Sequence, residues 1–445
     1  MDTRFLVHNL HLEGVDIFLA QDPQLRKLKS QVYIYTSSLL NEFPFKTAGI
    51  YTLTGGRQVG KTTLLKQWMA RLLAEGVDAN RIAFFSGELI DDAHGLLRLI
   101  QQQLSETDSL HMRYLIIDEV TYIVAWEKAI KYAADAGLLE NTILMLTGSD
   151  TVVIQEARMS FPGRRGLAAK TNFHLHPLSF REFIQLKTNA LNVQSISTGT
   201  LFDEFNNYLQ HGGYLTAIND IAKQGIIHEA TLITYSDWIR GDLLKHGKQE
   251  HYLREIVHAI IKRYSTQVSW NALAKDLSIE HPKTVSDYVE LLASMDAVFI
   301  QNALLEDKLI QAPKKAKKIM FSDPFIYHAM RYWLSPVEHP YQEQILPMVT
   351  QSDSCGKLVE STIVTHYARY YPTYYIKAEG EVDIAYVKNK KFWPVEIKWT
   401  NQIRSKDLKQ VRKYNNSVIL TKSPQAGEIN KVPTIPIPQA LIGLC

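Results

Sequence analysis

One stretch near the N-terminus, Thr54–Thr63, constrains this chain more than any other. It reads TGGRQVGKTT and so contains the pattern G-x-x-x-x-G-K-T. The apolar, β-prone run Ile50–Leu53 precedes it, and Leu64–Leu73 follows with apolar residues at helical spacing. Glycines let backbone N–H groups turn toward an anion, and the N-terminus of a helix adds partial positive charge. The stretch therefore predicts a phosphate-binding loop between a strand and a helix.

This loop predicts ATP and Mg²⁺ as cofactors. We expect Lys61 to reach the β- and γ-phosphates and Thr62 to bind Mg²⁺. The other expected nucleotide contacts come from the loop residues Gly55, Gly56, Arg57, Gln58, Val59, Gly60 and Thr63.

A second apolar run, Arg113–Glu119, ends in two acids. Central parallel strands are apolar throughout and deliver polar side chains at their carboxyl ends, where phosphates are bound in such sheets. We expect Asp118 to hold the Mg²⁺ shell through water and Glu119 to orient and deprotonate an attacking water. Two acids after a strand can also simply cap the next helix.

Polar residues after the next predicted strand are further candidates. Thr147 and Ser149 end the run Thr142–Ser149, where either side chain could sense the γ-phosphate; Ser149 could equally cap a helix. Arg164 and Arg165 lie on a predicted glycine turn and could supply an arginine finger in cis or from a neighbouring subunit. Surface arginines on such turns are common, so both readings stay open.

Several of these motifs occur together in one known family. The chain contains, in order, GRQVGKTT, LIIDE, LTGS, GRR, PLSFREF and HGGY. This combination resembles the prokaryotic AAA-type ATPases that carry a C-terminal DUF4143 domain, and the resemblance covers most of the chain. It implies nucleotide binding at Gly55, Gly60, Lys61, Thr62, Asp118 and Glu119.

The middle of the chain resembles a winged helix. Trp270–Leu277 and Lys283–Leu292 have the pattern of its second and third helices. The expected recognition helix displays both basic and acidic side chains, although a helix that contacts phosphates should be basic. DNA contact and docking to a partner or another domain therefore both remain open. The lysine run Pro313–Lys318 is typical of a solvated linker.

A second constellation lies in the C-terminal part. Asp383 belongs to the predicted strand Glu379–Tyr386, and Glu396 and Lys398 share one face of the next strand. Two carboxylates and a lysine so placed could bind Mg²⁺ and stabilise charge, which resembles the PD-(D/E)xK nuclease fold. Glu360 matches the helical acid of that fold, and so completes an expected metal set with Asp383 and Glu396.

The alternative is that these residues have no catalytic role, because acids and lysines at strand ends are common. The surrounding positive charge would suit a phosphodiester polymer. The basic residues are Lys388, Lys390, Lys391, Arg404, Lys406, Lys409, Arg412 and Lys413. From Gln311 onward the chain holds nineteen Lys and Arg against eleven Asp and Glu, although its total net charge is only +3. The proline-rich end from Ser423 is expected to form an extended closing tail.

Together these features predict an α/β fold. We expect a P-loop NTPase domain of AAA type with a helical lid, followed by a winged helix and a small restriction-endonuclease-like α/β domain. The expected segments are a lead-in at 1–45, the ATPase domain at 46–178, the lid at 179–247, the winged helix at 248–310 and the DUF4143-like, nuclease-like domain at 311–445.

Composition places the chain among globular proteins, with 46% hydrophobic and 21% charged residues. No apolar run is long enough to span a bilayer and only two cysteines are present, so we expect a cytoplasmic protein without membrane contact. The leading hypothesis is an ATP-hydrolysing switch that acts on DNA through a nuclease-like domain. The alternative is a nucleotide-gated interaction protein whose inactive nuclease fold binds a protein or DNA without cutting it, with self-association also left open.

Overall fold

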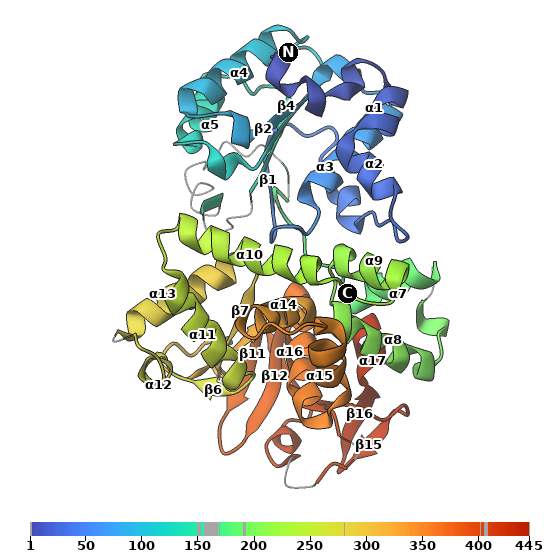
Figure 1. Ribbon diagram of the computed structural model, residues 1–445, viewed down its shortest axis with the longest axis vertical. Coiled ribbons are helices and arrows are strands. Elements are labelled where there is room, and N and C mark those ends of the chain that lie inside the picture. Colours follow the sequence, from blue (N-terminus) through green and yellow to red (C-terminus); the bar gives the residue numbers. More distant parts are fainter. Residues whose placement is uncertain are drawn as a thin grey trace. The chain divides into compact units, whose positions relative to one another are not determined.

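The computed structural model describes residues 2–148, 153–154, 168, 170–189, 193–279, 281–400, 402–404 and 408–444, except for the side chains of 352–354. The chain divides into two compact units, Met1–His176 and Pro177–Cys445. Figure 1 colours the first unit from blue to green and the second from green to red.

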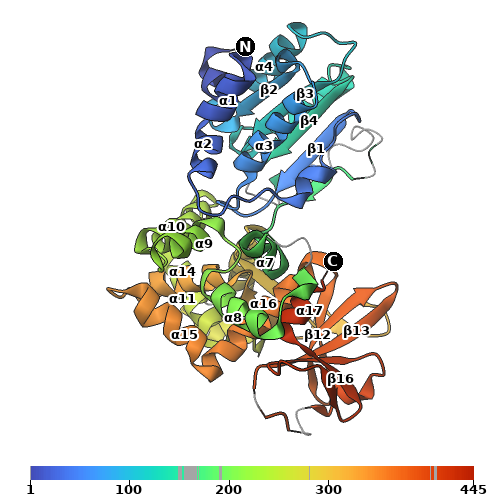
Figure 2. The same cartoon turned by 90° about the vertical axis from the view of Figure 1, so that its right-hand side faces the viewer.

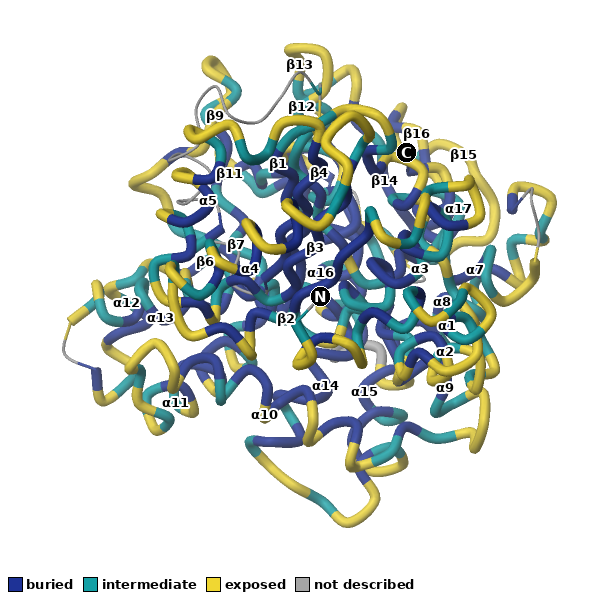
Figure 3. Tube along the Cα trace, turned by 90° about the horizontal axis from the view of Figure 1, so that it is seen from above, coloured by how far each residue is buried: buried dark blue, intermediate teal, exposed yellow. Residues whose placement is uncertain are grey.

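The first unit is built on a five-stranded parallel sheet with the strand order β2-β3-β4-β1-β5. Its strands are β1 Gly49–Thr54, β2 Ile82–Ser86, β3 Arg113–Asp118, β4 Thr142–Thr147 and β5 Asn172–His174. All residues of β3 and β4 are buried, as the dark blue tubes of Figure 3 show, because helices cover both faces. The predicted phosphate-loop strand, acid strand and following strand are thus neighbours in one parallel sheet.

Alternate residues of these strands face two separate cores. Leu115 and Leu144 pack in the core beneath the helices of one face, whereas Ile116 and Ile143 pack in the core of the other. The first face is covered by α4 Ala93–Ser105 and α5 Trp126–Asp135, and the second by α1 Val15–Gln21, α2 Pro23–Lys29 and α3 Lys61–Ala74 (Figure 2).

The N-terminal lead-in is attached to the helix that follows the phosphate loop. Lys66 on α3 lies 3.1 Å from Asp22 Oδ2, and both side chains are fully buried. The other oxygen of Asp22 caps α2 by accepting hydrogen bonds from the N–H groups of Gln24 and Leu25. Lys66 also donates to the carbonyl oxygen of His8. The lead-in is therefore part of the first unit's core.

The second unit begins with a group of helices. They are α7 Phe180–Thr188, α8 Thr198–His211, α9 Leu215–Gln224 and α10 Glu229–Lys245. A capping box begins α7, since Ser179 Oγ accepts from the Glu182 N–H and Glu182 Oε2 accepts from the Ser179 N–H. Further along the chain, α14 Pro324–Leu334 packs against α8 and α10.

Helices and a small antiparallel sheet follow. The helices are α11 Glu250–Lys262, α12 Trp270–Lys275 and α13 Pro282–Ser294. The strands are β6 Gln267–Val268, β7 Val298–Asn302 and β10 Lys317–Phe321, in the order β6-β10-β7, and β8 Leu304–Leu305 pairs with β9 Ile310–Gln311. In this register Lys318 lies opposite both Gln267 and Gln301.

A six-stranded mixed sheet completes the unit, in the order β11-β12-β13-β14-β16-β15. Its strands are β11 Thr373–Lys377, β12 Glu381–Lys388, β13 Lys391–Lys398, β14 Val418–Thr421, β15 Gly427–Ile429 and β16 Val432–Pro436. The accompanying helices are α15 Leu346–Thr350, α16 Ser352–Tyr370 and α17 Ile437–Ile442. The proline-rich end belongs to this sheet, because β16 pairs in parallel with β14 and antiparallel with β15.

No helix among the described residues is both long enough and apolar enough to cross a membrane.

Buried histidines join helices of the second unit. His328 on α14 is 2% exposed, and its Nε2 lies 2.9 Å from the carbonyl oxygen of Leu209 on α8. Burial lowers the pKa of His328 from its ordinary value to about 4, because the charged ring would lose its water. A carbonyl oxygen only accepts, so Nε2 carries the proton of the neutral ring.

We therefore expect His328 to make unfolding of the second unit pH-dependent. Its folded pKa is depressed, so its contribution is fully present above about pH 6.5 and is lost as the pH falls toward 4, on the order of 3 kcal/mol over that range. Urea unfolding of wild type and His328→Gln between pH 4 and 7.5 should show the two free-energy curves converging at low pH. The exposed His258 on α11 gives the control, His258→Gln; parallel wild-type and His328→Gln curves would contradict the expectation.

Candidate functional site

The phosphate loop leaves β1 and turns into α3 with two glycines in conformations that other residues rarely adopt. Gly55 has φ +145°, and a Cβ placed on it would lie 2.4 Å from the carbonyl oxygen of Leu175. Gly60 is the N-cap of α3 with φ +104°. The chain after β5 approaches the loop this closely because the Leu175 N–H donates to the Thr54 carbonyl oxygen at 2.9 Å. Gly55 is therefore required by a close backbone contact.

Lys61 is held inside the loop. Its ammonium donates to the carbonyl oxygens of Gly55 at 2.8 Å and Gly56 at 3.0 Å, and it lies 3.9 Å from Glu119 Oε1. The residue is buried, with 5% exposure. A buried ammonium beside the N-terminus of α3 is a favourable place for negatively charged phosphate oxygens.

Asp118, the last residue of β3, is bonded to the first turn of α3 and to the end of β4. Thr62 Oγ1 donates to Asp118 Oδ2 at 2.7 Å, and Thr147 Oγ1 donates to Asp118 Oδ1. The Glu119 N–H in turn donates to Thr147 Oγ1 at 3.0 Å. Since β4 lies between β1 and β3, its last residue Thr147 bridges the acid strand from the side of the phosphate loop.

The pair of Thr62 and Asp118 fits a Mg²⁺ ion bound together with phosphates. Mg²⁺ in nucleotide sites takes only one or two protein oxygens and completes its shell with phosphates and water. A hydroxyl and a carboxylate oxygen 2.7 Å apart, next to a helix N-terminus and a buried lysine, supply that set. The predicted nucleotide site thus offers oxygen ligands for the metal and hydrogen-bond donors for the phosphates.

Glu119 is held in an unusual backbone conformation, with φ 52° and ψ 46°. Its carbonyl oxygen would lie 2.4 Å from a Cβ on Gly87, so Gly87 permits β2 to approach this residue. A left-handed non-glycine residue costs about 1–3 kcal/mol and is frequently found at functional positions. The backbone at Glu119 thus turns away from the strand direction immediately after Asp118.

Other predicted loop residues have identifiable positions. Arg57 donates to the Tyr122 hydroxyl at 2.8 Å, and Gln58 adopts φ 58°. Tyr122 was not predicted; its only sequence signal is an aromatic residue three positions after Glu119. The predicted Ser149, Arg164 and Arg165 lie outside the described residues.

The C-terminal constellation lies on the antiparallel pair β12 and β13. Asp383 Oδ2 accepts from the Ile397 N–H at 2.8 Å, and Lys398 lies 2.6 Å from Glu396 Oε1. Glu396 is 4% exposed, and within the described residues its Oε2 has no hydrogen-bond partner. Burial raises the pKa of Glu396, and the neighbouring Asp383 carboxylate raises it further.

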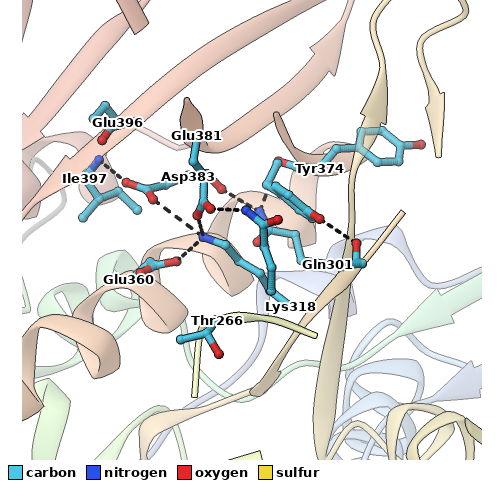
Figure 4. A network of polar contacts seen from close by, with 12 residues as sticks. Thr266, Gln301, Lys318, Glu360, Tyr374, Glu381, Asp383, Glu396 and Ile397 are labelled. Atoms are coloured by element: carbon cyan, nitrogen blue, oxygen red, sulfur yellow. Dashed lines mark hydrogen bonds and ion pairs between the residues drawn. The ribbon is translucent and has the colours of Figure 1, made fainter. Parts of the chain in front are cut away.

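A lysine that the sequence analysis assigned to a solvated run lies at the centre of these acids. Lys318 is 1% exposed, and its ammonium lies 2.8 Å from Glu360 Oε1, in contact with Glu381 and 3.7 Å from Asp383 Oδ1 (Figure 4). Burial lowers the pKa of Lys318, but the three carboxylates outweigh it and the net shift is upward. The expectation of a solvated linker is therefore wrong at Lys318.

The strands beside Lys318 contribute two more donors on the same face. Gln267 on β6 donates to Glu381, and Gln301 on β7 donates to the carbonyl oxygens of Asp383 at 2.8 Å and Tyr374 at 3.1 Å. Both residues lie opposite Lys318 in the three-stranded sheet. This sheet presents a row of donors to the acceptors of α16, β11 and β12.

The predicted nuclease metal set of Glu360, Asp383 and Glu396 is not drawn together around one point. Within the part of the chain that the structure describes, no three His, Cys, Asp or Glu side chains are placed to hold a metal ion. Burial raises the pKa of Glu360, and the Lys318 ammonium opposes that shift. Of the predicted basic residues, Lys409 and Lys413 both pair with Glu379, whereas Lys406 lies outside the described residues.

Comparison with known families assigns domains to three parts of the chain. Residues 47–184 match the model of an AAA domain, residues 202–336 match a domain of unknown function (DUF8612), and residues 355–440 match another (DUF4143). The matches to an AAA domain and to DUF4143 in one chain agree with the resemblance based on the motifs. The parallel five-stranded sheet agrees with the expected α/β class.

Similar individual proteins are distant. An uncharacterized protein of Haemophilus influenzae is 23% identical over 254 residues, which is 55% of this chain and 60% of that protein's length. A Walker-type ATPase of Pyrococcus abyssi is 16% identical, with a TM-score of 0.42, and the match covers 72% of this chain and 97% of that one. The ORC2 protein of Aeropyrum pernix, solved as ADPNP-ADP complexes, is 13% identical over 73% of this chain and 94% of that one, with a TM-score of 0.37.

The close contact at Gly55 gives a test of the phosphate loop. We expect Gly55→Ala to weaken binding of a fluorescent ATP analogue at least about tenfold. The added Cβ must displace the Leu175 carbonyl oxygen, and the φ of +145° at position 55 is strained for alanine. Gly95→Ala on α4, where a Cβ meets only ordinary contacts at 3.5 Å and beyond, is the matched control. Unchanged affinity in Gly55→Ala would show that the loop does not bind nucleotide in this conformation.

Proposed function

We propose that this chain is a Mg²⁺-dependent ATPase of AAA type whose hydrolysis controls a C-terminal unit that binds DNA. The observation that carries the first half is the linked set Thr62, Asp118, Thr147 and Glu119 beside the buried Lys61. These groups support the proposal because they include a cation for the phosphates, oxygens for a metal and a carboxylate that can act as a base.

The residues divide the work of hydrolysis. Lys61 and the loop N–H groups bind the β- and γ-phosphates and oppose the charge that develops there. Thr62 and Asp118 would hold Mg²⁺, which when bound neutralises phosphate charge. Glu119 orients the attacking water and accepts its proton. Thr147 fixes both acids, because its hydroxyl bonds the Asp118 carboxylate and the Glu119 backbone.

An arginine and a sensor complete the proposed site. Arg164 or Arg165 would contact the γ-phosphate, either within the chain or from a neighbouring copy, and Ser149 would report the presence of that phosphate. These roles rest on the motif order GRQVGKTT, LIIDE, LTGS and GRR.

The proposed base can be separated from nucleotide binding. Glu119→Gln should lower ATP turnover by about 10²–10⁴-fold while ATP affinity changes little, because the amide retains the shape but cannot take a proton. Lys61→Ala should lose both ATP turnover and ATP affinity. Phosphate release and analogue binding measured on the same preparations provide the test, with Glu127→Gln on α5 as control. Wild-type turnover in Lys61→Ala would sink the assignment.

For the second unit we propose a winged helix followed by a nuclease-like fold. The support for the first is the order α11, β6, α12, α13, β7, β10, with β10 between the other two strands. On α13, Lys283 and Glu290 are both exposed, so the helix surface is mixed in charge. DNA contact through α13 and docking of a partner there are both compatible with that surface.

The nuclease-like part has two candidate functions. In the first, Asp383, Glu396 and Lys398 cleave a phosphodiester with Mg²⁺. In the second, the fold binds DNA or a protein without cutting, and ATP gates that binding. The position of Lys318 favours the second, because its ammonium occupies the carboxylates that a metal would need. We therefore propose binding without cleavage.

Plasmid DNA tests this choice. We expect supercoiled DNA to stay intact with Mg²⁺ and wild-type protein, with or without ATP, and equally with Lys398→Ala. Gel-shift binding should weaken steeply as salt rises, since basic side chains release counterions from phosphates. Nicking by wild type and by Lys409→Ala that disappears in Lys398→Ala would instead establish a nuclease.

A further inference from the structure

We propose that the ammonium of Lys318 is the resident cation of the acid cluster formed by Glu360, Glu381 and Asp383, so that this cluster is assembled without a divalent metal. The inference deepens the second candidate above, a nuclease-like fold that binds without cutting. It concerns charges inside the second unit and makes no use of the ATP site.

The geometry places one cation among three carboxylates that come from different elements. Lys318 projects from β10, Glu360 from α16, and Glu381 and Asp383 from β12 (Figure 4). The ammonium touches Glu360 and Glu381 and lies 3.7 Å from Asp383. An ammonium has three donors and therefore suits three acceptors. Because this ammonium is completely buried, those acceptors must be charged or strongly polar.

A divalent ion and this ammonium would compete for the same oxygens. Mg²⁺ needs carboxylate oxygens at close and nearly octahedral positions. Here one oxygen of Glu360 and one of Glu381 contact Lys318, and Asp383 Oδ2 accepts from the Ile397 N–H. A metal at this point would also lie beside a buried positive charge, which raises its cost.

The neighbouring donors indicate that the surrounding sheet is built for the same purpose. Gln267 and Gln301 flank Lys318 in the register of β6, β10 and β7, and their amide groups donate toward Glu381 and the Asp383 backbone. Amide N–H groups stabilise carboxylates and carbonyls but cannot bind a cation. The ammonium and the two amide N–H groups of this row thus point donors at the acids, and Gln301 Oε1 is a buried acceptor in it that has no hydrogen-bond partner among the described residues.

The remaining members of the predicted metal set do not replace the lost ligands. Glu396 directs one oxygen to Lys398 at 2.6 Å, and its other oxygen is buried. Asp383 is shared between Lys318 and the backbone of Ile397. Within the described residues this leaves Glu360 Oε2 and Glu396 Oε2, and two carboxylate oxygens are too few for a protein-held Mg²⁺ without phosphate ligands.

The test measures Mn²⁺ binding to the full chain, free of nucleotide and DNA, by electron paramagnetic resonance. All proteins carry Asp118→Asn, which removes the carboxylate proposed to hold Mg²⁺ at the ATP site. In this background we expect Asp383→Asn to leave Mn²⁺ binding unchanged, because no Mn²⁺ ion is bound at Asp383. Lys318→Met should bind one Mn²⁺ ion at least about tenfold more tightly than the parent protein binds Mn²⁺, because the three carboxylates lose their internal cation.

The neighbouring lysine supplies the matched control. Lys317 is on the same strand but points to the other face, with its ammonium over the Trp270 ring, so Lys317→Met should gain no site. Thermal unfolding adds a second readout: Lys318→Met should melt lower than the parent, and Mn²⁺ should restore part of that loss, as expected for a ligand that binds only the folded state.

Each outcome decides the question. A Mn²⁺ site that is present with Lys318 intact and lost in Asp383→Asn overturns the proposal, even if Lys318→Met fails to fold. A folded Lys318→Met that gains no Mn²⁺ affinity also overturns it. Either result leaves the ATPase proposal untouched, since Lys61→Ala and Glu119→Gln are assayed separately; conversely, loss of the ATPase assignment would not alter the Mn²⁺ measurements.

Discussion

The burial of one ammonium group determines how the second unit is put together. Lys318 loses nearly all contact with water, and only its carboxylate neighbours make that arrangement stable. Removing one partner of a buried ion pair typically costs about 3–5 kcal/mol, because the other charge is left uncompensated. Glu360 on α16 and Glu381 on β12 are therefore fixed relative to β10. The small sheet and the C-terminal sheet consequently share one interior, and any function of this unit acts on both together.

The first unit depends on a different constraint, the insertion of β4 between the strand of the phosphate loop and the acid strand. This order separates Lys61 and Asp118 by one strand, and Thr147 at the end of that strand joins the two sides. Because hydroxyl groups can donate and accept at once, Thr147 satisfies an acid side chain and the next backbone N–H together. The site is thereby organised by a residue that need not touch the nucleotide.

Local patterns in the sequence were enough to predict the phosphate loop and the acid strand, because each is a contiguous motif. Lys318 escaped prediction for a physical reason. In the run Pro313–Lys318 every lysine looks alike, and only the two-residue period of β10 sends Lys317 outward and Lys318 inward. The end from Ser423 was predicted to be extended, but its pairing with β14 could not be predicted, since that pairing depends on residues distant in sequence. Composition cannot reveal which partner a strand will find.

The contact between the loop and β5 also bears on how the protein is synthesised. Thr54, next to Gly55, bonds to His174, a separation of 120 residues along the chain. Domains fold largely as units while the ribosome adds residues. The phosphate loop therefore leaves the ribosome long before β5, the strand that completes its surroundings. A nucleotide can bind to the complete loop, and so stabilise it, only after β5 has been made. We expect ATP to act late in the folding of this unit, as a ligand of the assembled sheet and not as a nucleus for it.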